Sequence, residues 1–284
     1  MIISEVNLRK KIKKILIEGT FGTITMGNKS SPEEESDDSG KKKNLEDFAE
    51  MKDVDIEAAK SNKVSGATGR ESGIKVSKVF EIAEKTGMKP SGVYGFMTVE
   101  SGGNASAMAT NPHKISGEPS LYSTPFGITN HREITQKWKD KGIRMESYYN
   151  AHSNEASIAI LEKMESVSKL AATSVTAFGS MQVMGAFILP RFNNDPDALH
   201  SSFKSDPEEF SVNALFDWVN HKDNKDFLGY VNEGDYKNAV RKYYGAHDAN
   251  YVSIASSAAA RFENHLEKHK KEADASSAED NANV

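Results

Sequence analysis

The sequence contains no cysteine among its 284 residues. Disulfide bonds, thiolate nucleophiles and thiolate metal ligands are therefore excluded. No stretch approaches about eighteen consecutive apolar residues, so the sequence predicts no membrane-spanning helix. We also expect no secretory signal peptide, because basic residues interrupt the apolar stretch that such a signal needs: Arg9, Lys10, Lys11, Lys13 and Lys14.

Several catalytic motifs are missing as well. The eight histidines include no His-Glu-x-x-His arrangement, which holds zinc on one face of a helix. The sequence has no phosphate-binding glycine loop and no serine in a nucleophile elbow. We therefore predict neither a metal nor a cofactor. The formal net charge of −5 gives no support to nucleic-acid binding, which favours a basic domain.

The composition is typical of a globular core with polar flanks. Hydrophobic residues make up 37% of the chain and charged residues 27%. The length suffices for one large domain or two small ones. Strand signals are sparse and helical periodicity is frequent, so we expect a mainly α protein with a small irregular or β insert.

The N-terminal segment, residues 1–26, begins with an amphipathic pattern. Leu8, Ile12, Ile15 and Leu16 follow helical spacing within residues 1–18, and lysines occupy the other face. This helix is interpreted as a docking segment for a partner protein, with membrane-surface binding as an alternative. A third interpretation is a capsid-targeting propeptide, because residues 16–19, Leu-Ile-Glu-Gly, resemble the cleavage signal of tailed-phage prohead proteases.

Residues 27–72 have the composition of a charged, flexible linker. Blocks of acidic residues are followed by Lys41-Lys42-Lys43, and such blocks bury little apolar surface. Within the linker, Leu45 to Ala59 has the pattern of a brief helix. The polar tail, residues 269–284, is predicted to be disordered. The globular domain is therefore expected to span residues 73–268.

Helical patterns recur through this domain. The first predicted helix carries Val76, Val79 and Phe80 on one face and ends near Gly87. Pro90 opens the next, which ends at Gly102-Gly103. Residues 104–150 are predicted to form loops with a small β-hairpin. Further helices are expected over Glu133–Lys139, Glu155–Ala172, Ala177–Ile188, Pro207–Asn220, Tyr236–Tyr244 and Ala249–Lys268.

Two short segments carry candidate chemistry. The first, Val99-Glu100-Ser101-Gly102-Gly103, puts one carboxylate at the end of an apolar helix. A partly desolvated glutamate can act as a general acid, because burial raises the pKa of a carboxyl group toward the working pH. The second segment, residues 174–185, places Gln182 within an apolar run. Taken singly, each residue is better explained without a function: Glu100 as a helix-terminal glutamate facing water, and Gln182 as a satisfied core amide.

Together the two segments resemble a known superfamily. Glu100-Ser101 followed by Gly179-Ser180-Met181-Gln182-Val183-Met184 is similar to the lysozyme-like proteins that include goose-type lysozymes and soluble lytic transglycosylases. The long spacing and the terminal Gly185 look most like the N-acetylmuramidase domain of phage endolysins. The chain departs from that family's pattern at Phe178, where the family has tryptophan, and at Tyr244, where it has asparagine.

The resemblance implies a lysozyme-like helical domain and a set of site residues. Glu100 would be the catalytic general acid, and the Ser101 hydroxyl would help to orient it. Gln182 and the backbone near Met184 would bind an N-acetyl sugar. Tyr243 would correspond to a tyrosine that forms a hydrogen bond near the catalytic glutamate.

An inverting mechanism would also need a second carboxylate. The irregular insert offers Glu118, Glu133, Asp140 and Glu146, and the sequence does not choose among them. His113 and His131 lie in the same insert. If none of these carboxylates faces the cleft, a lytic transglycosylase becomes the better reading, because the hydroxyl of the substrate itself can then attack.

The leading hypothesis is therefore a peptidoglycan hydrolase that cleaves between MurNAc and GlcNAc. A phage endolysin or virion-associated enzyme is expected, located in the virion or the host cytoplasm and acting on the cell wall, with a monomeric catalytic domain. Phage virion proteins are possible partners of residues 1–18. The alternatives are a virion structural or adaptor protein with a lysozyme-like domain, a lytic transglycosylase, and a secreted effector toxin.

Overall fold

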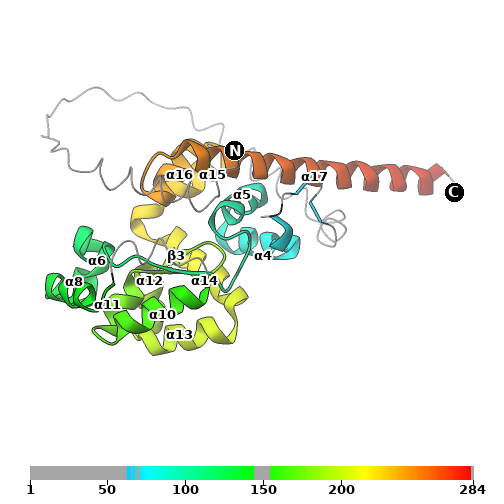
Figure 1. Ribbon diagram of the computed structural model, residues 1–284. Helices are drawn as coiled ribbons and strands as arrows, with labels where there is room; N and C mark the ends of the chain where they lie inside the picture. Colours follow the sequence, from blue (N-terminus) through cyan, green and yellow to red (C-terminus); the bar gives the residue numbers. More distant parts are fainter. Residues whose placement is uncertain (1–62, 65, 68, 70, 144–153, 283–284) are drawn as a thin grey trace, which may run out of the picture. The chain divides into compact units, whose positions relative to one another are not determined.

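The computed structural model describes residues 63–282, except 65, 68, 70 and 144–153 (Figure 1). The chain divides into two compact units. One comprises residues 62–265. The other joins residues 1–61 to residues 266–284, and its described part is helical as far as Ala282. The helices predicted within residues 1–18 and from Leu45 to Ala59, and the linker as far as residue 62, lie outside the described residues.

The fold is mainly helical with one small three-stranded antiparallel sheet, which confirms the expected class. None of the described helices is long and apolar enough to cross a membrane. The α-helices are α4 (Val76–Thr86), α5 (Pro90–Glu100), α6 (Lys114–Gly117), α7 (Pro119–Tyr122), α8 (His131–Asp140), α10 (Asn154–Glu165), α11 (Lys169–Ser174), α12 (Gly185–Ile188), α13 (Pro196–Ser205), α14 (Pro207–Asn220), α15 (Asp226–Asn232), α16 (Tyr236–Tyr244) and α17 (Ala249–Ala282). Short 3₁₀ helices are η2 (Glu71–Gly73), η3 (Thr124–Phe126), η4 (Leu189–Phe192) and η5 (Lys222–Asn224).

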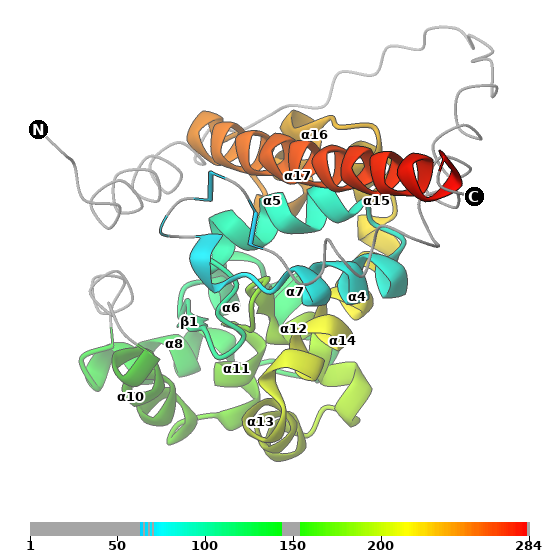
Figure 2. The ribbon, with the colours of Figure 1, turned by 90° about the vertical axis from the view of Figure 1, so that its right-hand side faces the viewer.

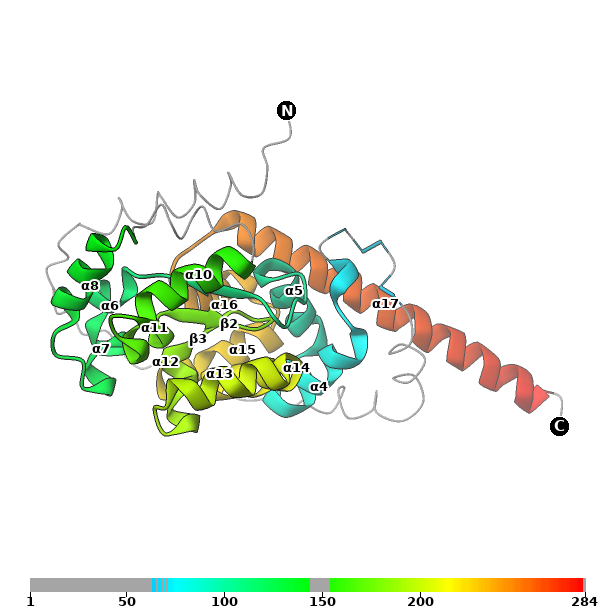
Figure 3. The ribbon, with the colours of Figure 1, turned by 60° about the horizontal axis from the view of Figure 1, so that its bottom comes forward.

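The sheet has the strand order β1 (Met108–Thr110), β2 (Thr176–Phe178), β3 (Val183–Met184). Met108 pairs with Phe178, and Ala177 pairs with Met184. Figure 3 shows β2 and β3 among α10, α11, α12 and α14. The sheet therefore pairs β1, which follows α5, with the β2–β3 hairpin. Thr110 at the end of β1 and Thr176 at the start of β2 are sixty-six positions apart.

Helix α5 is enclosed on all sides. Its residues from Pro90 to Val99 are all buried, and only its last residue, Glu100, is partly exposed. Figure 2 shows α5 running beside the first half of α17. This close approach requires glycine at position 95, where a Cβ would lie 2.5 Å from the backbone oxygen of Ala255. A helix buried all round must be apolar all round, which is what its sequence shows.

The apolar core has two regions. One is a mainly aliphatic cluster around Trp138, whose indole nitrogen donates to the carbonyl of Met164 at 3.0 Å. Beside α5, the Phe96 ring contacts aromatic rings of α15, α16 and α17 at centroid distances of 5.2–6.5 Å, namely Phe227, Tyr236, Tyr243 and Tyr251. The second region packs directly behind the end of α5.

Several predicted helices are confirmed. The helices Pro207–Asn220 and Tyr236–Tyr244 have the expected bounds. Each begins at an aspartate, Asp206 and Asp235, whose side chain accepts a hydrogen bond from a backbone N–H of the first turn. Asp206 illustrates why short polar residues before an apolar run mark a helix start reliably.

Two helix predictions are wrong. The predicted helix Glu155–Ala172 is broken into α10 and α11, because Ser168 leaves helical geometry and its hydroxyl caps the N–H of Ala171. The predicted helix Ala177–Ile188 is the β2–β3 hairpin followed by the single turn of α12. Apolar runs this short do not separate strand from helix by periodicity.

Two expectations about the segments that flank the globular domain also need correction. The described end of the expected linker is packed, since Val64 and Glu71 are buried. The guanidinium of Arg261, on α17, pairs with the Glu71 carboxylate, which satisfies that buried charge. At the other end, the expected disordered tail from residue 269 is instead helical through Ala282.

A partly buried Glu–His pair lies between α10 and α13. His200 Nδ1 is 3.2 Å from a carboxylate oxygen of Glu165, and His200 Nε2 is 3.1 Å from the Thr173 hydroxyl. Burial, with a smaller contribution from the charge of Lys169, lowers the pKa of His200 to about 4. Burial likewise raises the pKa of Glu165. Despite the short contact, the imidazole is therefore neutral near pH 7, and burial outweighs the attraction of an ion pair.

The first prediction concerns the contact between α5 and α17. Gly95→Ala should lower the free energy of unfolding by about 1–3 kcal/mol, because the added methyl overlaps backbone atoms of Ala255 that cannot move freely. Gly229→Ala on α15 is the matched control, since its Cβ meets nothing within 4 Å and alanine favours helix. Urea denaturation measures both. Equal stability of the two variants would contradict the close packing.

The second prediction concerns pH. A histidine whose folded pKa lies below its unfolded value stabilises the fold fully above about pH 6.5 and loses that contribution as the pH falls toward 4. We expect His200→Gln to flatten the pH dependence of unfolding in this window, by at most about 3 kcal/mol. Chemical denaturation of wild type and variant from pH 4 to 7 measures the pH dependence of the free energy of unfolding. Parallel curves for wild type and variant would show that His200 titrates normally.

Candidate functional site

Glu100 lies where the buried helix α5 reaches the surface. It is the last residue of α5, and the helix ends there because the N–H of Gly102 turns back to the carbonyl of Met97 at 2.9 Å with φ +64° at Gly102. The glycine stop predicted from the sequence is thus confirmed. The buried helix therefore holds the Glu100 carboxylate in a fixed position next to apolar side chains.

Tyr251 holds this carboxylate. Its hydroxyl donates a hydrogen bond to Glu100 Oε1 from the first turns of α17. Burial raises the pKa of Tyr251 well above its usual value, and the negative charge of Glu100 raises it further. Tyr251 therefore stays a neutral hydrogen-bond donor at any pH at which the protein would function.

Tyr243 bonds to the hairpin turn. Its hydroxyl donates to the backbone carbonyl of Met181 in the β2–β3 turn, and the residue is close enough to Glu100 to interact with its charge. Burial of that hydroxyl raises the pKa of Tyr243 well above its usual value, with a further contribution from Glu100. Tyr243 thus ties α16 to the hairpin, while Tyr251 contacts the carboxylate.

Tyr251 is not among the site residues expected from the sequence. The only available signal was its place seven residues beyond Tyr244 in an Asp-Ala-Asn-Tyr segment. That segment opens a new helix, where Asp248 accepts a hydrogen bond from the N–H of Tyr251 at 3.0 Å. The start of α17 therefore sets the position of the tyrosine.

Ser101 joins the helix end to the hairpin. Its hydroxyl donates to the carbonyl of Ser180 at 2.6 Å, which links two segments 79 residues apart. The N–H of Ser180 in turn donates to the Ser211 hydroxyl on α14 at 3.1 Å. Ser101 fixes the backbone beside Glu100 through this contact with the β2–β3 turn.

Gln182 sits in the turn with an unusual backbone. Its φ is +52°, a left-handed conformation that non-glycine residues seldom adopt. Its amide nitrogen donates to the carbonyls of Ala107 at 3.0 Å and Gly179 at 2.9 Å. Both amide hydrogens are therefore used inside the protein, and only the side-chain oxygen is left to meet a ligand.

The two glycines of this segment are required by close contacts. A Cβ at Gly179 would lie 2.3 Å from the Ser211 hydroxyl, and Gly179 itself has φ +79°. A Cβ at Gly185 would lie 2.0 Å from the carbonyl oxygen of Thr173. The glycine spacing noticed in the sequence therefore reflects how tightly the hairpin packs.

Met184 and Phe178 line the hairpin on opposite strands. Met184 is partly buried against the Trp138 cluster, and its backbone lies on β3, an edge strand of the sheet. Phe178 is buried against Phe203 and Phe210 at centroid distances of 5.3 and 6.0 Å. Phe178 therefore serves as core.

The expected second carboxylates are engaged elsewhere. Glu118 pairs with Lys114 at 2.7 Å and Glu133 with Lys137 at 2.6 Å. Asp140 accepts from the Gln136 amide at 2.8 Å. Glu146 lies outside the described residues. His131, the first residue of α8, accepts from the Thr135 hydroxyl through its backbone carbonyl at 2.9 Å. Within the described part of the chain, no three His, Asp or Glu side chains gather as a metal site would require.

Comparison of the sequence with protein-family models and with curated proteins finds no match.

The third prediction separates the two tyrosines. A double-mutant cycle between Tyr251→Phe and Glu100→Leu should give a coupling energy of about 1–3 kcal/mol, as expected for a hydrogen bond to a charged group. The same cycle with Tyr243→Phe should give less than about 0.5 kcal/mol, because that hydroxyl bonds to Met181. Denaturant unfolding measures both cycles. A larger coupling for Tyr243 would contradict this assignment of the two hydroxyl groups.

Proposed function

We propose that this protein cleaves the glycan backbone of peptidoglycan between MurNAc and GlcNAc, with Glu100 as the general acid. The observation that carries the proposal is the carboxylate itself, held by Tyr251 at the end of an otherwise buried helix. The resemblance of the two segments to lysozyme-like enzymes supports it, as does the contact that brings those segments together at Ser101 and Ser180.

The chemistry needs a proton delivered to the leaving glycosidic oxygen. A carboxyl group does this efficiently when its direction is fixed and part of its hydration shell is removed. Tyr251 fixes the direction of the carboxyl group by donating a hydrogen bond to Oε1 of Glu100. The aromatic rings of Phe96, Tyr243 and Tyr251 exclude water from behind the carboxyl group.

Sugar binding is proposed for the hairpin. The Gln182 side-chain oxygen can accept from a sugar hydroxyl or amide, since its nitrogen is already used. The backbone of Met184 lies on the edge strand, whose outer side can pair with an N-acetyl group. Ser101 contributes by fixing the loop between them, and Tyr243 by anchoring the turn at Met181.

A second candidate function is a lytic transglycosylase. It is favoured by one observation, namely that Glu118, Glu133 and Asp140 are each bound to a neighbour on their own or an adjoining helix. In that reaction no second carboxylate is needed. Glu100 protonates the leaving oxygen as the glycosidic bond breaks, and its carboxylate then takes the proton of the substrate's own hydroxyl as that oxygen bonds to the sugar carbon. The product then carries an anhydro-MurNAc end.

A phage origin, a monomeric catalytic domain and attachment of residues 1–18 to virion proteins are further parts of the proposal. Such attachment would deliver the enzyme to the wall from a particle, whereas a free endolysin would need a lysis pore. A virion structural or adaptor protein that lacks activity is the competing class, and it is distinguished by whether cleavage occurs at all.

The fourth prediction tests the general acid. Glu100→Gln keeps the size of the side chain and an acceptor for Tyr251, but it has no proton to give. Cleavage of purified peptidoglycan should fall by about 10²–10⁴-fold, while the melting temperature changes little. Mass spectrometry of the released fragments gives the rate and the chemistry of the ends.

Glu233→Gln is the matched control, because Glu233 is exposed beyond the end of α15 and should retain full activity. Reducing MurNAc ends would establish a muramidase, and anhydro-MurNAc ends a transglycosylase. Full activity in Glu100→Gln would remove Glu100 from the mechanism. No cleavage by the wild-type chain would favour the structural protein.

A further inference from the structure

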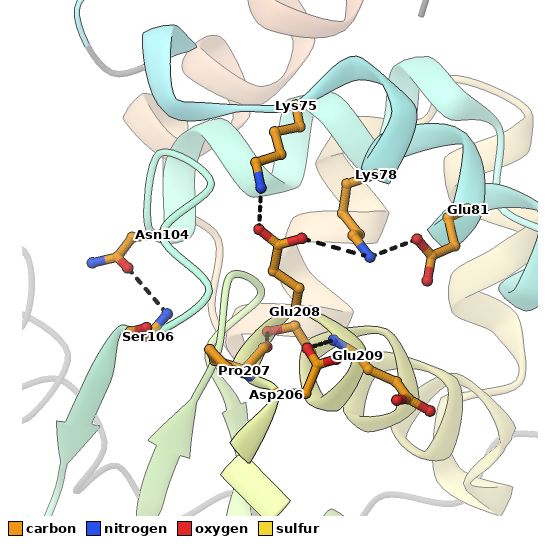
Figure 4. A network of polar contacts seen from close by, with 10 residues as sticks. Lys75, Lys78, Glu81, Asn104, Ser106, Asp206, Pro207, Glu208 and Glu209 are labelled. Carbon is orange, nitrogen blue, oxygen red and sulfur yellow. Dashed lines mark hydrogen bonds and ion pairs between the residues drawn. The ribbon is translucent and has the colours of Figure 1, made fainter. Parts of the chain in front are cut away.

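A second feature lies next to the Glu100 loop and has no part in acid catalysis. A hollow of 240 Å³ is lined by residues from four segments, among them Lys75 and Lys78 of α4 and its cap, Asn104 of the loop after Glu100, Ser180 of the hairpin turn, and Glu208 of α14. Figure 4 shows these charged side chains facing one another across the space between α4 and α14.

The hollow is close to the candidate catalytic carboxylate along the chain. Met97, on its wall, lies one helical turn before Glu100, a rise of about 4.5 Å. Gly103, also on the wall, is three residues after Glu100, so their Cα atoms are at most about 11 Å apart. A sugar chain that reaches Glu100 can therefore place a substituent in the hollow.

Two lysines in the hollow, Lys75 and Lys78, can bind a carboxylate, and the side chain of Glu208 occupies that position. One oxygen of Glu208 bonds to the ammonium of Lys75, and the other lies 3.9 Å from the ammonium of Lys78. Lys78 also pairs with Glu81 at 2.5 Å. The Glu208 side chain is partly exposed, with 39% of its surface accessible, so another carboxylate can compete for the lysines.

Ser180 adds an unused polar group to the wall. The residue is 2% exposed, and its hydroxyl oxygen has no hydrogen-bond partner. Buried hydroxyl groups normally have a partner, and this unpaired one belongs to a residue that lines the hollow. The same residue accepts the hydrogen bond from Ser101, which connects this wall to the loop of Glu100.

We propose that this hollow binds a carboxylate of the peptide stem that hangs from the muramic acid of peptidoglycan. The inference rests on the proposed function, since only that substrate carries both a glycan for Glu100 and an acidic peptide beside it. Lys75 and Lys78 receive the carboxylate, and the Glu208 side chain moves aside when it binds. Glycan chains that keep their stems are then preferred over chains without them.

The fifth prediction tests binding apart from catalysis. Isothermal titration calorimetry uses the full chain and the soluble stem peptide L-Ala-D-γ-Glu-meso-diaminopimelate-D-Ala. Lys75→Ala with Lys78→Ala should weaken binding about tenfold, because two charge-assisted contacts are lost. Glu208→Gln should tighten binding severalfold, because it removes the competing carboxylate. The two effects have opposite signs, which a general loss of folding would not produce.

Two controls sharpen the measurement. Lys163→Ala on α10 removes an exposed lysine away from the hollow and should bind as wild type does. The same peptide with its carboxylates amidated should not bind. The proposal is overturned if the wild-type chain does not bind the acidic peptide, or if the double lysine variant binds it equally well.

Failure of this inference and failure of the proposed function give different results. If the wild-type chain cleaves the glycan but does not bind the peptide, the subsite is wrong and the catalytic proposal stands. If the chain binds the peptide with the expected lysine dependence but cleaves nothing, the carboxylate site stands and the glycosidase is wrong.

Discussion

The complete burial of α5 is the constraint on which the rest of the structure depends. Ten consecutive residues of this helix are enclosed, and α17 approaches so closely at Gly95 that only a hydrogen fits between the two backbones. A helix fixed in this way cannot rotate or slide without breaking contacts on every side. Glu100 therefore emerges in one place only, and its carboxylate meets Tyr251, which α17 carries on the same packed surface.

The hairpin is the second fixed part, and it is held by polar contacts rather than by strand length. β3 has two residues, too few to hold a register by themselves. Ser101, Tyr243 and Gln182 each bond to a backbone carbonyl in or beside the turn. These bonds offset the cost of the left-handed backbone at Gln182, and such strain persists only where its surroundings enforce it.

The proposed general acid and the proposed carboxylate-binding hollow lie on surfaces of different chemical character. The aromatic rings behind Glu100 provide a water-poor wall against which a single proton can be transferred. In the hollow beside α4 the lysines are already paired with the Glu208 carboxylate. A ligand carboxylate that replaces Glu208 therefore leaves the lysines paired, and little free energy is lost to an unpaired charge. Ser180 lies next to both, because its carbonyl accepts a hydrogen bond from Ser101, beside Glu100, while its own hydroxyl has no hydrogen-bond partner.

The sequence by itself determined the elements that local signals specify. Asp206, Asp235, Pro90 and Gly102 mark helix ends through backbone geometry and capping, which act within a few residues, and the mainly helical class followed from the periodicity. It also picked out Glu100 and the glycine-rich hairpin segment as candidates.

Only the tertiary structure decided the rest. The run from Ala177 to Ile188 became a hairpin because β1, distant in sequence, pairs with it, and no local pattern contains that information. Tyr251, and not Tyr243, donates to Glu100 because the direction of α17, set by its packing on α5 at Gly95, chooses which hydroxyl arrives there. The hollow at Lys75 and Glu208 likewise lies between α4 and α14. Lys75 and Glu208 are 133 positions apart, and in the sequence each has the pattern of an ordinary solvated surface charge.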